Sequence, residues 1–179
     1  MKLCVPFLLG ALLLSIPALA DLMSGPDVGA AVPAAKVFAA TGPNEGKELD
    51  YPAERKEKPT LYLMIREFDR PVARYMKTMD QELASASAEA HVVAVWLTDD
   101  QAKTRTYLPR VQMSLKMEHT SMCVFPGDKN GPNDWNLSPD ARVTTVLAVK
   151  GKVVKTFAYS SINDTEVRPV LAALKDAVK

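Results

Sequence analysis

The sequence predicts an α/β fold in which a central mixed β-sheet carries helices on both faces. Two nearly uninterrupted apolar runs of strand length, Thr60–Ile65 and His91–Leu97, indicate strands that are covered on both sides. A segment with helical periodicity follows each of these runs. Two β-rich runs near the C-terminus, Val143–Val149 and Lys152–Tyr159, are joined by Lys150-Gly151 and predict a hairpin. Alternating strands and helices favour a parallel sheet, to which the hairpin adds an antiparallel edge.

The first part of the chain is predicted to be less regular. Residues 21–36 are rich in Ala, Pro and Gly and are interpreted as an extended lead-in. Residues 36–39 predict an early strand, and the turn residues Gly42-Pro43-Asn44 predict the loop that follows it. The stretch Tyr51–Lys58 carries five charged side chains and is expected to be a solvated connector.

Two helices are predicted from apolar residues at offsets of 0, 3, 4, 7 and 11, which place them on one helical face. The residues concerned are Val72, Tyr75, Met76, Met79 and Leu83 in the first helix, and Val167, Val170, Leu171, Leu174 and Val178 in the last. The helical stretch after Asp99-Asp100 contains Pro109, which is expected to kink it or to restart it. A short strand is predicted over Ser121–Phe125.

The N-terminus has the layout of a secretory signal peptide. Lys2 is followed by the uncharged apolar stretch Leu3–Ile16 and by Ala18-Leu19-Ala20, a cleavage pattern ahead of Asp21. An uncleaved anchor is the alternative interpretation. We expect residues 1–20 to be removed and residues 21–179 to form a single periplasmic or secreted domain with no membrane span.

Composition argues against several classes of partner. The chain has 22 basic and 21 acidic residues and shows no basic stripe or charge block, so neither a nucleic acid nor an acidic membrane is expected as a partner. With two histidines, no zinc cluster of recognisable spacing exists, and no Gly-rich phosphate loop follows a strand. No cofactor, metal or catalytic residue is therefore predicted.

The order of elements resembles the thioredoxin-like superfamily, and in particular its exported members related to peroxiredoxins. The resemblance covers residues 27–179, beginning with a Val-Gly-x-x-x-Pro segment at Val28–Pro33. It implies a three-layer fold and a Trp-Cys-Gly-Pro-Cys motif between the strand ending near residue 65 and the next helix. Aligned without gaps, that motif falls on Phe68, Asp69, Arg70, Pro71 and Val72, so both cysteines of the family's dithiol are absent.

A second departure concerns the family's cis-proline, which faces the dithiol. Thr144 takes its place here, and a cis bond before a residue other than proline costs about 2.5–4 kcal/mol. The family's catalytic residues therefore carry over to no position. Asp69 is interpreted as a helix N-cap, with a polar recognition spot formed by Asp69 and Arg70 as the alternative.

Cys123 is the only cysteine that remains after signal cleavage, because Cys4 lies within the signal. A buried core thiol is the favoured interpretation. The alternatives are a reactive thiol that works alone or with an external reductant, and a nucleophile pair with His119, which needs a bend in the strand because residues four apart lie about 13 Å from each other.

Met113, Met117, His119, Met122 and Cys123 gather soft ligands within eleven residues. Such ligands select Cu(I), which makes a copper chaperone a further alternative.

Disulfide exchange needs an attacking thiolate and a second thiol that resolves the mixed disulfide. From the missing second thiol we predict a redox-inactive protein, not an enzyme, that binds a protein or peptide partner through the rim formed by Phe68, Asp69, Arg70, Pro71, Val72 and Thr144. The main alternative is a thiol-dependent antioxidant or disulfide oxidoreductase that acts through Cys123.

Overall fold

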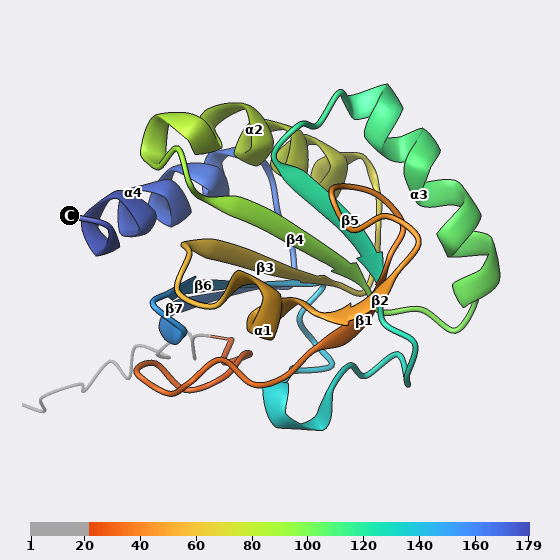
Figure 1. Ribbon diagram of the computed structural model, residues 1–179, viewed down its shortest axis with the longest axis horizontal. Helices are drawn as coiled ribbons and strands as arrows, with labels where there is room; N and C mark the ends of the chain where they lie inside the picture. Colours follow the sequence, from red (N-terminus) through yellow and green to blue (C-terminus); the bar gives the residue numbers. More distant parts are fainter. Residues whose placement is uncertain (1–21) are drawn as a thin grey trace, which may run out of the picture.

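The computed structural model describes residues 22–179 (Figure 1). The predicted signal peptide, residues 1–20, and with it Cys4, lies outside these residues. Of the helices in the described part of the chain, none has the length and apolarity needed to cross a bilayer.

A seven-stranded mixed sheet forms the centre of the molecule, in the order β2-β1-β5-β4-β3-β6-β7. Its three middle strands β5, β4 and β3 run parallel, while β1 pairs with β5, and β6 with β3, in the antiparallel sense. The strands are β1 (Lys36–Ala39), β2 (Glu48–Asp50), β3 (Thr60–Ile65), β4 (His91–Trp96), β5 (Thr120–Val124), β6 (Val143–Val149) and β7 (Lys152–Tyr159). The predicted α/β fold with a mixed central sheet is confirmed.

Three long helices cover one face of this sheet. They are α2 (Arg70–Ala86), α3 (Gln101–Leu115) and α4 (Val167–Ala177), and all three contribute to one apolar cluster. The five predicted core residues of α2 are buried, as are Val167, Val170, Leu171 and Leu174 of α4. The helical period of the sequence therefore identifies the face that packs on the sheet.

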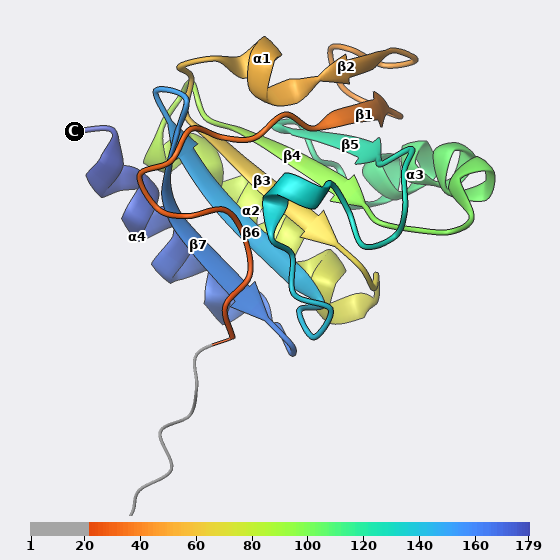
Figure 2. The same cartoon turned by 90° about the horizontal axis from the view of Figure 1, so that it is seen from below.

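The other face is covered mainly by irregular chain. Figure 2 shows the lead-in and the segment after β5 on the near side of the sheet, with α2 and α4 behind it. The short helix α1 (Tyr51–Arg55) and the 3₁₀ turns η1 (Asn133–Trp135) and η2 (Asp164–Glu166) complete the elements. Tyr51 and Trp135 are buried in the apolar cluster of this second face, where Trp135 makes an edge contact with Tyr62 at 5.5 Å between ring centroids.

One prediction about local structure is wrong. The expected solvated connector Tyr51–Lys58 contains α1, because Tyr51 supplies a large apolar ring for the second face, while most of the charged residues after it are exposed. Of the two outcomes expected at Pro109, a restarted helix is excluded, since α3 runs through Pro109 from Gln101 to Leu115. The predicted hairpin turn is present, with positive φ at Lys150 (54°) and Gly151 (70°) as a type I′ turn requires.

A buried carboxylate ties α2 to the start of β5. Asp80 is 3% exposed, and its oxygens accept hydrogen bonds from the backbone N–H groups of Glu118 (2.9 Å) and His119 (2.8 Å) and from the Thr120 hydroxyl (2.7 Å). Buried polar groups are tolerated when they are bonded in this way. The hydrogen bonds of Asp80 in α2 therefore hold the start of β5, the strand that carries Cys123, in place.

The substitution Asp80→Ala is expected to lower the free energy of unfolding by about 2–4 kcal/mol, because two part-buried N–H groups and a buried hydroxyl lose their acceptor. Urea denaturation followed by circular dichroism measures the loss. Glu82→Ala, at an exposed position of the same helix, is the matched control and should change stability by less than about 0.5 kcal/mol. Equal effects of the two substitutions would contradict the role assigned to Asp80.

Candidate functional site

The strand-to-helix junction after β3 lies where the degenerate motif was aligned. β3 ends at Ile65 and α2 begins at Arg70, with Pro71 in its first turn. Asp69 is the N-cap residue, and its Oδ1 accepts a hydrogen bond from the backbone N–H of Val72 at 3.1 Å. The helix N-terminus is thereby capped by a carboxylate.

The sequence does not indicate the partner of the Asp69 carboxylate, which is Arg142. Arg142, just before β6, donates from Nη1 to Asp69 Oδ2 at 2.6 Å and places Nη2 2.8 Å from Glu67 Oε2. A basic residue in a loop carries no periodic signal, so only the pairing of β3 with β6 brings it to the junction. One carboxylate oxygen of Asp69 accepts from the Val72 N–H and the other accepts from Arg142. Asp69 therefore links the start of α2 to the residue that precedes β6.

The remaining residues of the predicted rim are not all brought together. Phe68 packs on Trp96 at 5.3 Å between ring centroids and lines a shallow surface groove with Tyr107 and Arg110 of α3. Arg70 and Pro71 are exposed, whereas Val72 is fully buried.

Thr144 is buried within β6. Its hydroxyl lies 2.6 Å from that of Ser24 in the lead-in, so it packs under the N-terminal segment. Residues 22–179 contain no cis peptide bond. The rim contact that Thr144 was expected to make comes instead from Arg142, two residues earlier.

Cys123 lies fully buried in β5, on the same face of the sheet as Tyr51. Burial raises the pKa of its thiol well above the ordinary value, because the charged thiolate is disfavoured where water is excluded. At neutral pH the group is therefore held as the thiol. Its neighbour is not His119, the candidate considered from sequence, but the hydroxyl of Tyr51.

A small polar pocket lies beside this thiol, between α1, the loop after β1 and the sheet. We call it the Tyr51 pocket. Its volume is about 130 Å³, and its lining includes Asn44, Tyr51, Arg55, Lys58, His91 and Ser121. His91 Nε2 lies 2.8 Å from Ser121 Oγ. Ser121 and Cys123 are two residues apart on one strand and therefore share a face, which places the thiol next to the pocket.

His91 is held neutral in this pocket. Burial, followed by the positive charge of Arg55, lowers its pKa from 6.5 to about 4, and the carboxylate of Asp80 only partly opposes the change. A neutral imidazole at 2.8 Å from a hydroxyl can donate or accept the hydrogen bond, depending on its tautomer. No signal in the sequence connects Tyr51 with His91, because they are forty residues apart and meet only through the fold.

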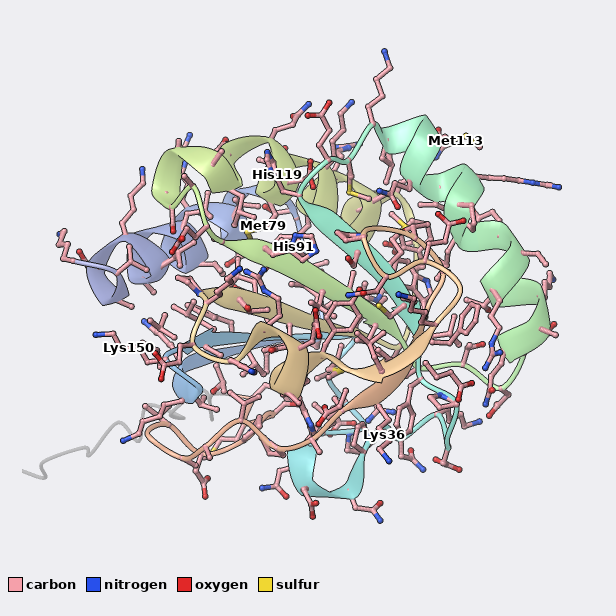
Figure 3. All side chains as sticks on the ribbon, viewed as in Figure 1. Lys36, Met79, His91, Met113, His119 and Lys150 are labelled. Carbon is pink, nitrogen blue, oxygen red and sulfur yellow. The ribbon has the colours of Figure 1, made fainter. Side chains whose placement is uncertain are left out.

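The soft ligands proposed for copper are not gathered at one place. Met113 is 72% exposed, and Figure 3 shows it on the outer side of α3, away from the sheet. Met122 and Cys123 are neighbours on β5 and point to opposite faces, into different apolar clusters. Within residues 22–179 no group of three or more His, Cys, Asp or Glu side chains is placed to hold a metal ion. The geometry does not favour a copper site here.

Comparison with known proteins identifies the fold. No family model matches the sequence, and no curated protein matches it. Among solved structures, reduced Prx3 of Vibrio vulnificus in complex with hydrogen peroxide has a TM-score of 0.62 at 13% identity, over 85% of this chain and 98% of that one. A protein assigned as the thiol:disulfide interchange protein DsbE in Chlorobium tepidum has a TM-score of 0.58 at 18% identity, over 83% and 99%. The yeast mitochondrial 1-Cys peroxiredoxin has 0.59 at 12%, over 85% and 78%. The predicted thioredoxin-like fold is confirmed.

These neighbours overturn the predicted function. The prediction of a redox-inactive binding module, and of a chain that is not an enzyme, is wrong, because the structures that share its fold are those of peroxiredoxins and of a thiol:disulfide interchange protein. That prediction depends on the missing second thiol. In the yeast 1-Cys peroxiredoxin, the thiol is resolved via glutathione and thioredoxin systems. A missing second thiol therefore does not exclude redox chemistry in this fold.

The capping role of Asp69 can be separated from its ion pair. Asp69→Ala is expected to lower the free energy of unfolding by about 1–2 kcal/mol, since it removes the cap. Asp69→Asn keeps an oxygen for the Val72 N–H and loses only the charge opposite Arg142, a half-exposed pair of small energy, so it should lose less than about 1 kcal/mol. Urea denaturation measures both. If Asn were as harmful as Ala, the ion pair rather than the cap would hold the junction.

The lowered pKa of His91 predicts an acid-sensitive fold. Between pH 6.5 and about 4 the unfolded chain binds a proton at this residue that the folded chain does not, so stability is complete above pH 6.5 and falls as the pH decreases through this range. The loss amounts to about 3 kcal/mol. Unfolding free energies should be measured from pH 4 to 7.5 for the wild type and for His91→Gln. The pH dependence that His91 causes should be absent in the variant. An unchanged slope would contradict the burial of a neutral imidazole.

Proposed function

We propose that the chain is an exported, thiol-dependent antioxidant enzyme that acts through Cys123 and uses an external thiol as reductant. The observation that carries the proposal is the position of Cys123, the one cysteine of residues 22–179, next to the Tyr51 pocket. The peroxide complex of one neighbour and the external resolution of the thiol in another support this class of chemistry.

The reaction uses one protein thiol, that of Cys123, and consumes two molecules of an external thiol. The Cys123 thiolate attacks a hydroperoxide, takes one oxygen atom and releases the alcohol after protonation, which leaves Cys123 as a sulfenic acid. An external thiol then condenses with the sulfenic acid, forming a mixed disulfide and water. A second external thiol attacks the mixed disulfide, restores the Cys123 thiol and leaves as the oxidised disulfide.

Two features of the site control the rate of the first step. The raised pKa of Cys123 keeps the thiolate scarce at neutral pH. The ring of Tyr51, itself buried, covers the thiol from the side of the pocket, so a reactant reaches Cys123 when α1 moves. α1 has five residues, and its N-cap residue Asp50 makes no side-chain capping bond to it, which makes it the weakest element around the thiol.

Export fits the same chemistry, and we propose it on the sequence alone. The apolar stretch Leu3–Ile16 and the Ala-x-Ala pattern are typical of a signal peptide. Cleavage would remove Cys4 and leave a single thiol, so the enzyme could not form an intramolecular disulfide and would depend on a reductant outside the cytoplasm.

The proposal predicts that hydroperoxide consumption by the purified chain, with a small thiol present, depends on Cys123. The chain should carry Cys4→Ser so that one thiol remains. Cys123→Ser and Cys123→Ala are both expected to reduce the rate to the level of the buffer, with circular dichroism confirming that they fold. The wild-type rate should rise about tenfold per pH unit between pH 7 and 9, because the thiolate fraction grows in that proportion below the pKa.

Turnover that persists in both Cys123 variants would overturn the proposal, and so would the absence of turnover above the buffer rate in the parent chain. A rate that does not change with pH would show that the reacting group is not this buried thiol.

A further inference from the structure

The Tyr51 pocket contains a polar group with no partner. The Tyr51 side chain is 2% exposed, and its hydroxyl lies close to Asn44, Ser121 and Cys123 without reaching good hydrogen-bond geometry with any of them. A buried hydroxyl without a hydrogen-bond partner destabilises the fold, so a ligand that supplies one is favoured. Tyr51 lines the pocket, and a turn of its side chain would bring the hydroxyl, which is shielded from solvent as it stands, to an acceptor placed there.

The charges around the pocket favour an anion. The Arg55 guanidinium donates only to neutral acceptors, namely the Thr60 hydroxyl at 3.0 Å and the carbonyl oxygens of Pro59 (3.1 Å) and Glu89 (2.8 Å). Of the ion pairs present in residues 22–179, none involves Arg55 or Lys58. Glu54 is the one acidic residue of the lining, so two cations face a single carboxylate.

The size of the pocket limits the ligand. Its 130 Å³ corresponds to the liquid volume of about four water molecules. A peptide does not fit, whereas a short carboxylate does. Cations from α1 and the segment after it, together with a hydroxyl donor, provide the charge-assisted hydrogen bonds that a carboxylate requires.

We propose that the Tyr51 pocket binds a small carboxylate-bearing thiol, which is the reductant of Cys123. The inference rests on the proposed function. The carboxylate lies against Lys58, Arg55 and the Tyr51 hydroxyl, and the sulfur points toward Cys123. When α1 moves, the Tyr51 ring turns away from Cys123 and its hydroxyl toward the carboxylate, and this sulfur condenses with the Cys123 sulfenic acid as water leaves. A second molecule of the thiol then releases the first as a disulfide.

The first test measures binding to the reduced protein, without turnover. 3-Mercaptopropionate is titrated under anaerobic conditions while backbone amide signals of residues 51–58 and 121–123 are followed by NMR, with the uncharged 3-mercaptopropanol in a parallel titration. Saturable changes in chemical shift are expected with 3-mercaptopropionate. Its affinity should be at least fivefold higher than that of 3-mercaptopropanol.

Variants locate the site. Lys58→Gln should weaken binding of the carboxylate at least threefold, whereas Lys56→Gln, which changes an exposed lysine outside this pocket, should leave it unchanged. Tyr51→Phe removes the unpartnered hydroxyl, so it should weaken binding while the protein becomes no less stable. Absence of saturable shifts, equal affinity for the two thiols, or equal effects of the two lysine substitutions would overturn the inference.

The second test measures peroxide-dependent oxidation of each thiol. Lys58→Gln should raise the KM for 3-mercaptopropionate at least threefold more than it raises the KM for 3-mercaptopropanol. Binding without any Cys123-dependent turnover would overturn the proposed function and the reductant role, but not the carboxylate site. Turnover with no preference for the carboxylate would overturn the inference and leave the proposed function intact.

Discussion

The structure depends on covering both faces of the three parallel strands β5, β4 and β3. Every residue of β3 is buried, so each face must be sealed from water. The helices α2, α3 and α4 seal one face with regular apolar stripes. The other face is sealed by the lead-in, α1 and the segment that carries Trp135. Irregular chain brings polar groups with it, and this is why the Tyr51 pocket and its unpartnered hydroxyl lie on this side, beside Cys123.

Periodicity predicts the regular half of the fold well. The runs at β3 and β4, the hairpin at Lys150-Gly151 and the apolar stripes of α2 and α4 are all recoverable from local spacing. Short elements are not. β2 has three residues and α1 has five, too few to show a period, and the charges of residues 54–58 conceal the one buried ring at Tyr51. Pro109 lies inside α3, and the structure gives no local reason in sequence for the helix to continue through it.

The candidate site could be predicted only in part. The junction at Asp69 follows from aligning one motif, and its cap follows from the chemistry of a carboxylate at a helix N-terminus. Arg142, His91 and Tyr51 come from elements distant in sequence and meet through the pairing of strands. The functional prediction failed for a related reason. It treated the missing dithiol at positions 69 and 72 as decisive, whereas the thiol that remains lies elsewhere on the sheet, and a neighbour of the same fold has its thiol resolved by external systems.

The bond network of Asp80 sets the direction from which solvent can enter. Because that carboxylate accepts hydrogen bonds from residues 118–120, the helical side of β5 is held to α2 where the strand begins. The opposite face is covered by a five-residue helix, which is the side that opens more easily. Amide hydrogen exchange should consequently be slow at residues 118 and 119 and fast in α1.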